Sequence, residues 1–113
     1  MREIKFRIWD VNFREMCFDR DLMDEDYLNI VRYNVKPDQH KIMQYTGLKD
    51  KNGTEIYEGD IVVFKNWKPK SVVFQTNGVQ TFVFDGTDLW LSSYDSEHYK
   101  VIGNIYQNPE LLE

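Results

Sequence analysis

The sequence contains no alanine and only one cysteine, Cys17, among its 113 residues. Alanine is the best helix former, so its absence argues against a mostly helical protein. A single cysteine cannot form a disulfide within the chain. No segment approaches the roughly 20 apolar residues that a membrane-spanning helix needs, and the start, MREIKFRIW, has no apolar run typical of a signal peptide. We therefore expect a protein of a reducing, intracellular compartment, without a membrane segment.

Positive charge is also in short supply. The chain has 19 acidic and 14 basic residues, which gives a formal charge of -5. Such a charge repels a phosphate backbone at long range and argues against broad nucleic-acid binding, although local basic patches stay open. The length is typical of one globular domain, and the composition, 42% hydrophobic and 29% charged, is not that of a disordered chain.

Aromatic residues are abundant, with seven Phe, seven Tyr and three Trp. Together with many Val and Ile, they suit strands rather than helices. Residues 3–9 alternate in the manner of a strand with one buried face, and a second apolar run, Met16 to Phe18, follows a polar turn. The pair predicts a β-hairpin.

The next segment is less regular. Residues 19–26 hold five carboxylates and are interpreted as a loop, while residues 27–33 fit either a strand or a short helix. The stretch from Lys36 to His40 contains Pro37 and is interpreted as a linker. The chain is accordingly divided into an N-terminal β-rich region, residues 1–41, and a second domain, residues 42–113, that ends in a short tail.

The second half contains several strand-like runs, which are Ile42 to Tyr45, Ile61 to Phe64, Ser71 to Thr76, Val79 to Phe84, Leu89 to Leu91 and Lys100 to Tyr106. Asn77-Gly78 separates two of these runs and predicts a two-residue hairpin turn. In that register Thr76 faces Val79, Phe74 faces Thr81 and Val72 faces Val83.

Smaller signals complete the pattern. Asp85-Gly86 predicts a turn, and Gly103 marks a bulge in the last strand. Asn108 and Pro109 are placed as the cap and first residue of a final helical turn.

Three segments resemble one known family. KFRIWD at the start, IMQYTGLKDKNGTEIYEGDIV in the middle and VIGNIYQNPELL at the end are similar to the YopX family of small proteins encoded by bacterial phages and prophages. The resemblance covers nearly the whole chain and is weakest between Met16 and His40. It implies a β-rich N-terminal part and an SH3-like small barrel beginning near Tyr45, and it implies no established activity.

The segment KDKNGTEIYEGDIV brings oxygen-bearing side chains close together in the manner of a calcium loop. Counted from Asp50, however, the glycine stands at the fourth position, whereas an EF-hand has its glycine at the sixth. Ile61 stands at the twelfth position, where an EF-hand requires a bidentate Glu. The segment is interpreted as a tight turn at Asn52-Gly53. A second turn is expected at residues 58–60.

Other candidates for chemistry are few. Glu58 and Asp60 would suit acid–base catalysis only in a cleft, and a turn with Asp60 bonded to nearby amides is the preferred interpretation. Cys17, His40 and His98 lack the spacing of a zinc site, and burial is the ordinary explanation for Cys17. The chain carries no Walker, dinucleotide or nucleophile-elbow motif. We expect neither an enzyme nor a bound cofactor or metal.

The stretch KNWKPK contains the residues proposed for binding, which are Lys65, Trp67, Lys68 and Lys70. An indole in a loop can stack on a base while ammonium groups contact phosphates. The alternative is a solvated turn whose Trp67 folds back onto the barrel. The acidic run at residues 19–26 is in the same way either a solvated loop or a surface for a basic partner.

The sequence thus predicts a mainly β protein with an SH3-like barrel in its C-terminal part and an N-terminal β-hairpin region. As function we expect a non-enzymatic phage or prophage accessory protein of the host cytoplasm, acting through a protein partner or as a homo-oligomer. Weak single-stranded nucleic-acid binding is the alternative, and an enzyme using Glu58 and Asp60 is a third class.

Overall fold

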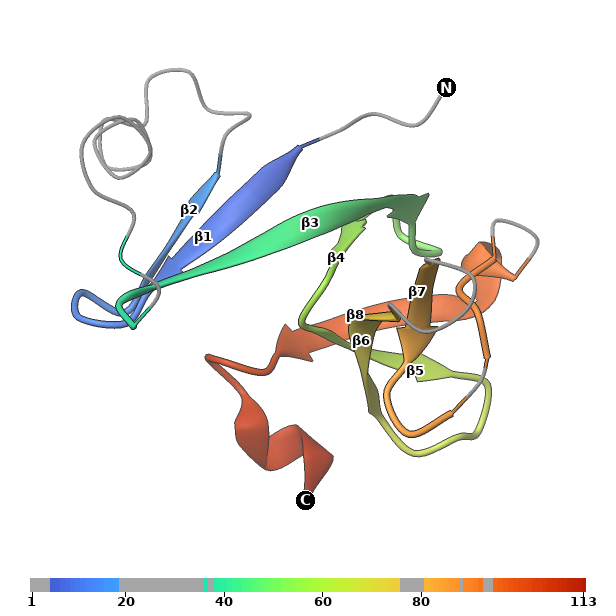
Figure 1. Ribbon diagram of the computed structural model, residues 1–113. Coiled ribbons are helices and arrows are strands. Elements are labelled where there is room, and N and C mark those ends of the chain that lie inside the picture. The colour runs from blue at the N-terminus through green and yellow to red at the C-terminus, as the bar shows by residue number, and fades with distance from the viewer. Residues whose placement is uncertain (1–4, 19–35, 37, 76–80, 88, 93–94) are drawn as a thin grey trace. The chain divides into compact units, whose positions relative to one another are not determined.

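The structure is a computed structural model that describes residues 5–18, 36, 38–75, 81–87, 89–92 and 95–113. Strands dominate the described residues, and the helices among them are two short 3-10 turns (Figure 1). The mainly β prediction is therefore confirmed. None of the described helices is long and apolar enough to cross a bilayer.

The chain forms two compact units, Met1–Tyr45 and Thr46–Glu113. It passes from one to the other inside a single long strand, β3 (His40–Lys49). The boundary predicted between residues 41 and 42 falls within the same strand. Lys36 and Gln39, which were interpreted as part of a linker, lie in a turn that leads into β3, where the Gln39 N–H donates to the Lys36 carbonyl.

The first unit is built around β1 (Phe6–Asp10), which pairs antiparallel with β2 (Glu15–Phe18) and with the start of β3. The predicted hairpin is confirmed. The prediction of one buried face is wrong, because Arg7 and Asp10 are buried as well as Ile8 and Trp9. Neighbouring strands flank β1 on both sides, and its alternate residues are covered on both faces.

The second unit contains β4 (Glu55–Tyr57), β5 (Asp60–Phe64), β6 (Lys70–Gln75), β7 (Thr81–Phe84) and β8 (Tyr99–Asn104). Four of these strands form an antiparallel sheet in the order β7-β6-β5-β8, and β4 pairs with β3. The 3-10 turns are η1 (Ser96–His98) and η2 (Pro109–Leu112).

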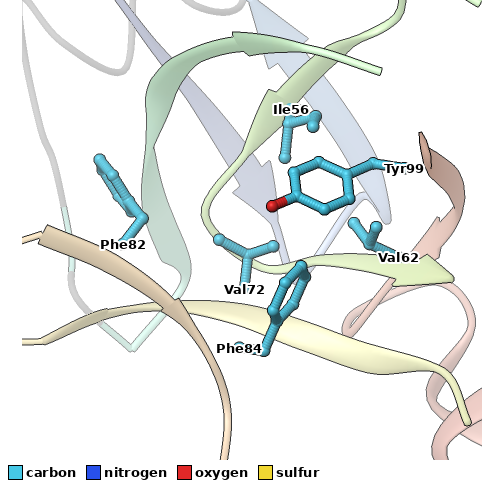
Figure 2. Close-up of a cluster of buried hydrophobic side chains, with 6 residues drawn as sticks. All are labelled: Ile56, Val62, Val72, Phe82, Phe84 and Tyr99. Carbon is cyan, nitrogen blue, oxygen red and sulfur yellow. The ribbon is translucent and has the colours of Figure 1, made fainter. Parts of the chain in front are cut away.

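The core of the second unit is rich in aromatic rings. Figure 2 shows the Tyr99 ring among aliphatic side chains and Phe84, and the cluster consists of Ile56, Val62, Val72, Phe82, Phe84 and Tyr99. Tyr99 meets Phe84 edge to face, with ring centroids 5.4 Å apart. Such contacts add to the stabilisation that area burial alone supplies.

The predicted register of the β6–β7 hairpin is wrong by one residue. Val72 pairs with Phe84 and Phe74 with Phe82, which puts these four residues on one face of the sheet. The predicted pairing of Val72 with Val83 would have turned Phe82 and Phe84 away from Val72. Burial of both phenylalanines in the core explains the shift. The predicted turn at Asn77-Gly78 lies outside the described residues.

A bulge interrupts β8 as expected. Ile61 pairs with Gly103 and the next residue, Val62, pairs with Val101, so Ile102 is the extra residue. The predicted strand from Leu89 to Leu91 is reduced to a single bridge between Trp90 and Val83.

Asn108 contacts the backbone of β8 near the end of the chain. This residue precedes η2 as predicted, but its side chain makes no cap hydrogen bond to the helical turn. Its Oδ1 instead accepts the N–H of Asn104 at 3.2 Å. A Cβ on Gly103 would lie 2.5 Å from the same Oδ1, so the close approach requires glycine at that position.

The acidic run at residues 19–26 and the strand or helix expected at residues 27–33 also lie outside the described residues.

Candidate binding surfaces

The residues predicted for binding surround the turn between β5 and β6. The Phe64 carbonyl accepts the N–H of Trp67 at 3.1 Å, which closes a turn with Lys65 and Asn66 in the middle. Lys65 has a φ of 57°, a left-handed backbone conformation that residues other than glycine and asparagine seldom adopt.

Trp67 leans on the edge of the core. Its ring meets Phe64 edge to face at 5.4 Å, and 40% of the residue stays exposed. Around it is a shallow depression lined by Val62, Phe64, Trp67, Lys68, Lys70 and Phe84, which has no enclosed space for a water molecule. The geometry matches the interpretation in which Trp67 folds back onto its own domain. Its role in binding stays a prediction.

Lys65 belongs to a different feature, a groove of about 220 Å³ lined by Lys51, Val63, Lys65, Glu97, His98 and Lys100. We call it the basic groove. Lys100 stands opposite Val63 in the β5–β8 pair. Because their neighbours Val62 and Tyr99 point into the core, Val63 and Lys100 point outward. The four lysine and tryptophan positions predicted for binding are thus divided between two places.

Lys51 reaches the groove through the turn that was first compared with a calcium loop. Its backbone N–H donates to the Tyr99 carbonyl at 3.0 Å. The preceding Asp50 is buried, and its Oδ1 accepts the N–H groups of Asn52 and Thr54 at 2.8 and 2.9 Å. Its Oδ2 accepts the N–H of Val101 at 2.9 Å. Asp50 therefore ties the turn to β8, and the turn interpretation is confirmed, with Gly53 at a φ of 81°.

The second turn follows the same principle. Asp60 is buried and its Oδ2 accepts the N–H of Tyr57 at 2.8 Å, while Gly59 has a φ of 88°. The expected bond between Asp60 and a nearby amide is confirmed. This carboxylate holds the turn into β5, and Glu58 beside it is half-buried.

The groove carries an excess of positive charge. Glu97 is the acidic residue among those that line it, and it lies 3.5 Å from the Nε2 of His98. Among the residues that the structure describes, no carboxylate forms an ion pair with the three lysines of the groove. The Nζ of Lys65 lies over the Phe64 ring, 5.0 Å from its centroid, which is a cation–π distance.

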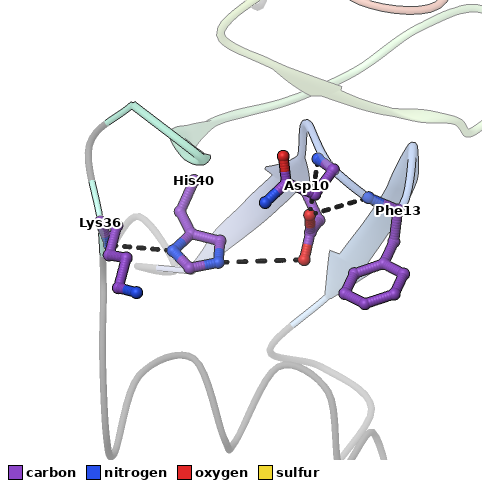
Figure 3. A network of polar contacts seen from close by, with 5 residues as sticks. Asp10, Phe13, Lys36 and His40 are labelled. Atoms are coloured by element: carbon purple, nitrogen blue, oxygen red, sulfur yellow. Dashed lines mark hydrogen bonds and ion pairs between the residues drawn. The ribbon is translucent and has the colours of Figure 1, made fainter.

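A third surface lies in the first unit, at the turn between β1 and β2. The Oδ1 of Asp10 accepts the N–H groups of Asn12 and Phe13 at 3.0 and 3.1 Å. Its Oδ2 lies 3.8 Å from Nε2 of His40, and Nδ1 of His40 accepts the Lys36 N–H at 2.9 Å. Figure 3 shows this series of contacts running from Lys36 to Phe13.

The contacts of the two His40 ring nitrogens indicate which of them carries the proton. In neutral imidazole one nitrogen accepts and the other carries the proton, so an accepting Nδ1 leaves the proton on Nε2, facing Asp10. The Nδ1 atom is thus occupied by the Lys36 N–H, and Nε2 lies near the Asp10 carboxylate. Cys17 is buried beside Ile8, as expected for a structural cysteine.

Other chemistry is sparse. Within the described part of the chain, no group of three or more His, Cys, Asp or Glu residues is arranged to hold a metal ion. The pKa of Tyr99 is raised, mainly because burial disfavours the phenolate. The hydrogen bond that the Ser92 N–H donates to the phenolic oxygen opposes this effect, and the charge of Asp95 adds to it.

The chain has a recognisable protein family. The sequence pattern described as YopX protein matches residues 5–113. The chain belongs to the YopX family. The resemblance seen in three sequence segments is confirmed, and the match extends across both units.

The YopX segments correspond to places where side chains hold the backbone. Asp50 and Asp60 lie in the middle segment, and Gly103, Asn104 and Asn108 lie in the last one. The Oδ1 of Asn104 accepts the N–H groups of Tyr106 and Gln107 at 3.0 and 2.9 Å. The family segments thus contain the residues that fix turns.

One solved structure is similar over its whole length. The crystal structure of protein EF1440 from Enterococcus faecalis aligns with a TM-score of 0.69 and 29% sequence identity, and the alignment covers 100% of both chains. Its name indicates no activity. No curated protein matches the chain.

Sequence reasoning missed two features of these surfaces. Lys51, His98 and Lys100 are distant from Lys65 in the sequence. The β5–β8 pairing and the backbone bond from Lys51 to Tyr99 bring them together. Phe13 lies in a polar turn, which the strand pattern does not single out. Its apolar side chain between Asn12 and Arg14 is a signal that pattern reasoning could have used.

Proposed function

We propose that this protein is a non-enzymatic accessory protein of a bacterial phage or prophage, which acts in the host cytoplasm by binding another protein. Membership of the YopX family supports the phage or prophage origin. The engagement of Asp60 and His40 in structural hydrogen bonds supports a role in binding rather than catalysis.

The fold of the second unit supports the same role. We propose that it is an SH3-like small barrel. Its four-stranded antiparallel sheet and the core to which β4 contributes Ile56 support this proposal. Barrels of this type serve as binding modules for peptides and nucleic acids. Because one fold hosts many functions, this analogy alone carries little weight.

The observation that carries the proposal is the exposure of Phe13. This side chain is 76% exposed at the β1–β2 turn, and Val11 in the same turn is 40% exposed. Aromatic side chains are enriched among the residues that dominate the energy of protein interfaces. Because Asp10 already holds the turn that carries Phe13, less conformational entropy is lost when this side chain docks. The turn therefore suits insertion of Phe13 into an apolar pocket of a partner.

The test is affinity capture from the infected host with three forms of the protein. The wild type and Leu112→Ser, which alters another exposed apolar residue, should recover the same partner. Phe13→Ser should lose it while keeping its circular dichroism spectrum and melting temperature. Equal recovery by all three forms would refute the role of the turn. Light scattering on the purified protein distinguishes a foreign partner from a second copy of this chain.

A second candidate is weak binding of single-stranded nucleic acid by Lys65, Trp67, Lys68 and Lys70. The exposed part of the Trp67 ring, beside the exposed Lys68, favours it. The chain's charge of -5 and the packing of Trp67 on Phe64 oppose it. A Trp67→Phe variant and the wild type should differ in oligonucleotide gel mobility at low salt if this candidate is correct.

A further inference from the structure

The basic groove concentrates positive charge on a protein that is acidic as a whole. Lys51, Lys65 and Lys100 come from three separate segments and line one groove of about 220 Å³. Positively charged side chains around one groove attract an anion. The groove is therefore an electrostatic exception to the net charge of -5.

The backbone under these lysines is fixed by interactions other than ligand binding. The N–H of Lys51 bonds to the Tyr99 carbonyl, and the buried carboxylate of Asp50 bonds to Val101. Lys100 lies between these two β8 residues and pairs with Val63. Two of the three lysines are thus anchored to the same strand, and a ligand would meet a preformed arrangement.

The size of the groove limits what it can hold. Its volume of about 220 Å³ is below the roughly 300–1,000 Å³ that is typical of pockets for drug-sized ligands. Val63 supplies an apolar wall, and Glu97 opposes anions near His98. The groove thus suits one phosphate group with a small substituent better than an extended polyanion.

We propose that the basic groove binds the phosphate group of a small molecule, either inorganic phosphate or a small monoester. The ammonium groups of Lys51 and Lys100 contact the phosphate oxygens, and that of Lys65 joins them by leaving its position over the Phe64 ring. Val63 contacts the substituent of an ester. This site is separate in residues from the β1–β2 turn, so the proposal stands whether or not Phe13 binds a partner.

The experiment is an NMR titration of the ¹⁵N-labelled protein at low ionic strength, with inorganic phosphate and with glycerol phosphate. Saturable shifts are expected at the amides of Val63, Lys65 and Lys100. Lys51→Ala and Lys100→Ala should each weaken binding about tenfold, which corresponds to the loss of one charge-assisted contact. Lys65→Asn should do the same, since asparagine tolerates the left-handed backbone at this position.

Lys49→Ala is the matched control. Lys49 is exposed on β3 and does not line the groove, so its loss changes the net charge equally and should weaken binding less than twofold. Tighter binding of glycerol phosphate than of inorganic phosphate identifies a monoester, and equal affinity identifies phosphate itself. The proposal is overturned by shifts that do not saturate, by an equal effect of Lys49→Ala, or by binding of an oligonucleotide without binding of either small phosphate.

Discussion

Asp50 and Val101 are 51 residues apart in the sequence, yet the carboxylate Oδ2 of one accepts the backbone N–H of the other at 2.9 Å. The other oxygen of the same carboxylate accepts the two N–H groups of its own turn. One side chain therefore shapes the β3–β4 turn and fastens it to β8. The position of Lys51 in the basic groove follows from this bond.

Replacement of Asp50 by alanine should lower the free energy of unfolding by about 3 kcal/mol, because it leaves three backbone N–H groups without their charged acceptor. Urea denaturation at neutral pH measures the loss. Asp85→Ala is the control, since Asp85 is exposed and contributes only backbone bonds to the described hydrogen bonding. A loss for Asp50→Ala no greater than that of the control would contradict the role assigned to the carboxylate.

Replacement of Gly103 by alanine should cost about 1–3 kcal/mol through overpacking against Asn108. The new Cβ would lie 2.5 Å from Asn108 Oδ1, and moving that side chain breaks its bond to the Asn104 N–H. A double-mutant cycle with Asn108→Gly checks the mechanism, because the contacting atoms are then absent. The two changes should be less than additive in urea denaturation. Full additivity would exclude Asn108 as the cause.

Replacement of Arg14 by glycine should raise the free energy of unfolding by about 0.5–1 kcal/mol. Arg14 has a φ of 55°, which is strained for a residue with a Cβ, and its side chain is exposed. Thermal and urea denaturation of Arg14→Gly and Arg14→Ala separate the relief of backbone strain from the loss of the side chain. Alanine removes the same side chain without relieving the backbone, so a gain with both variants would point away from strain.

The raised pKa of Tyr99 predicts a loss of stability in alkali. The folded state retains the phenolic proton more tightly than the unfolded state, whose reference pKa is 10.0. The free energy of unfolding should therefore fall as the pH rises above 10 and through the folded pKa. Urea denaturation between about pH 9 and pH 11.5 measures the slope, which is set by this difference in pKa.

The control for this prediction is Tyr99→Phe. Loss of the hydroxyl removes the bond from the Ser92 N–H and should cost about 1 kcal/mol at neutral pH. Above pH 10 the variant should lose stability less steeply than the wild type. Parallel curves for the two proteins would mean that other groups cause the alkaline transition.

Local signals in the sequence predicted most strands and the turns at Gly53, Gly59 and Gly86 correctly. The glycines at 53, 59 and 86 all have positive φ, as turn chemistry requires, and the bulge at Gly103 is present. Turn residues act on the backbone next to them, so a single sequence contains the information needed. The β6–β7 register was wrong because the loop signal competes with burial of Phe82 and Phe84, and core packing is a non-local quantity.

The sequence by itself determined the β class, the YopX family, the excess of acidic charge and the turns at Gly53 and Gly59, because each depends on composition or on neighbouring residues. Only the tertiary structure decided which side chains meet. It placed Lys65 in one groove with Lys51 and Lys100, while Trp67 lines a different depression. The reason is that strand pairing joins residues far apart in the chain, and alternation along each strand decides which of them share a face.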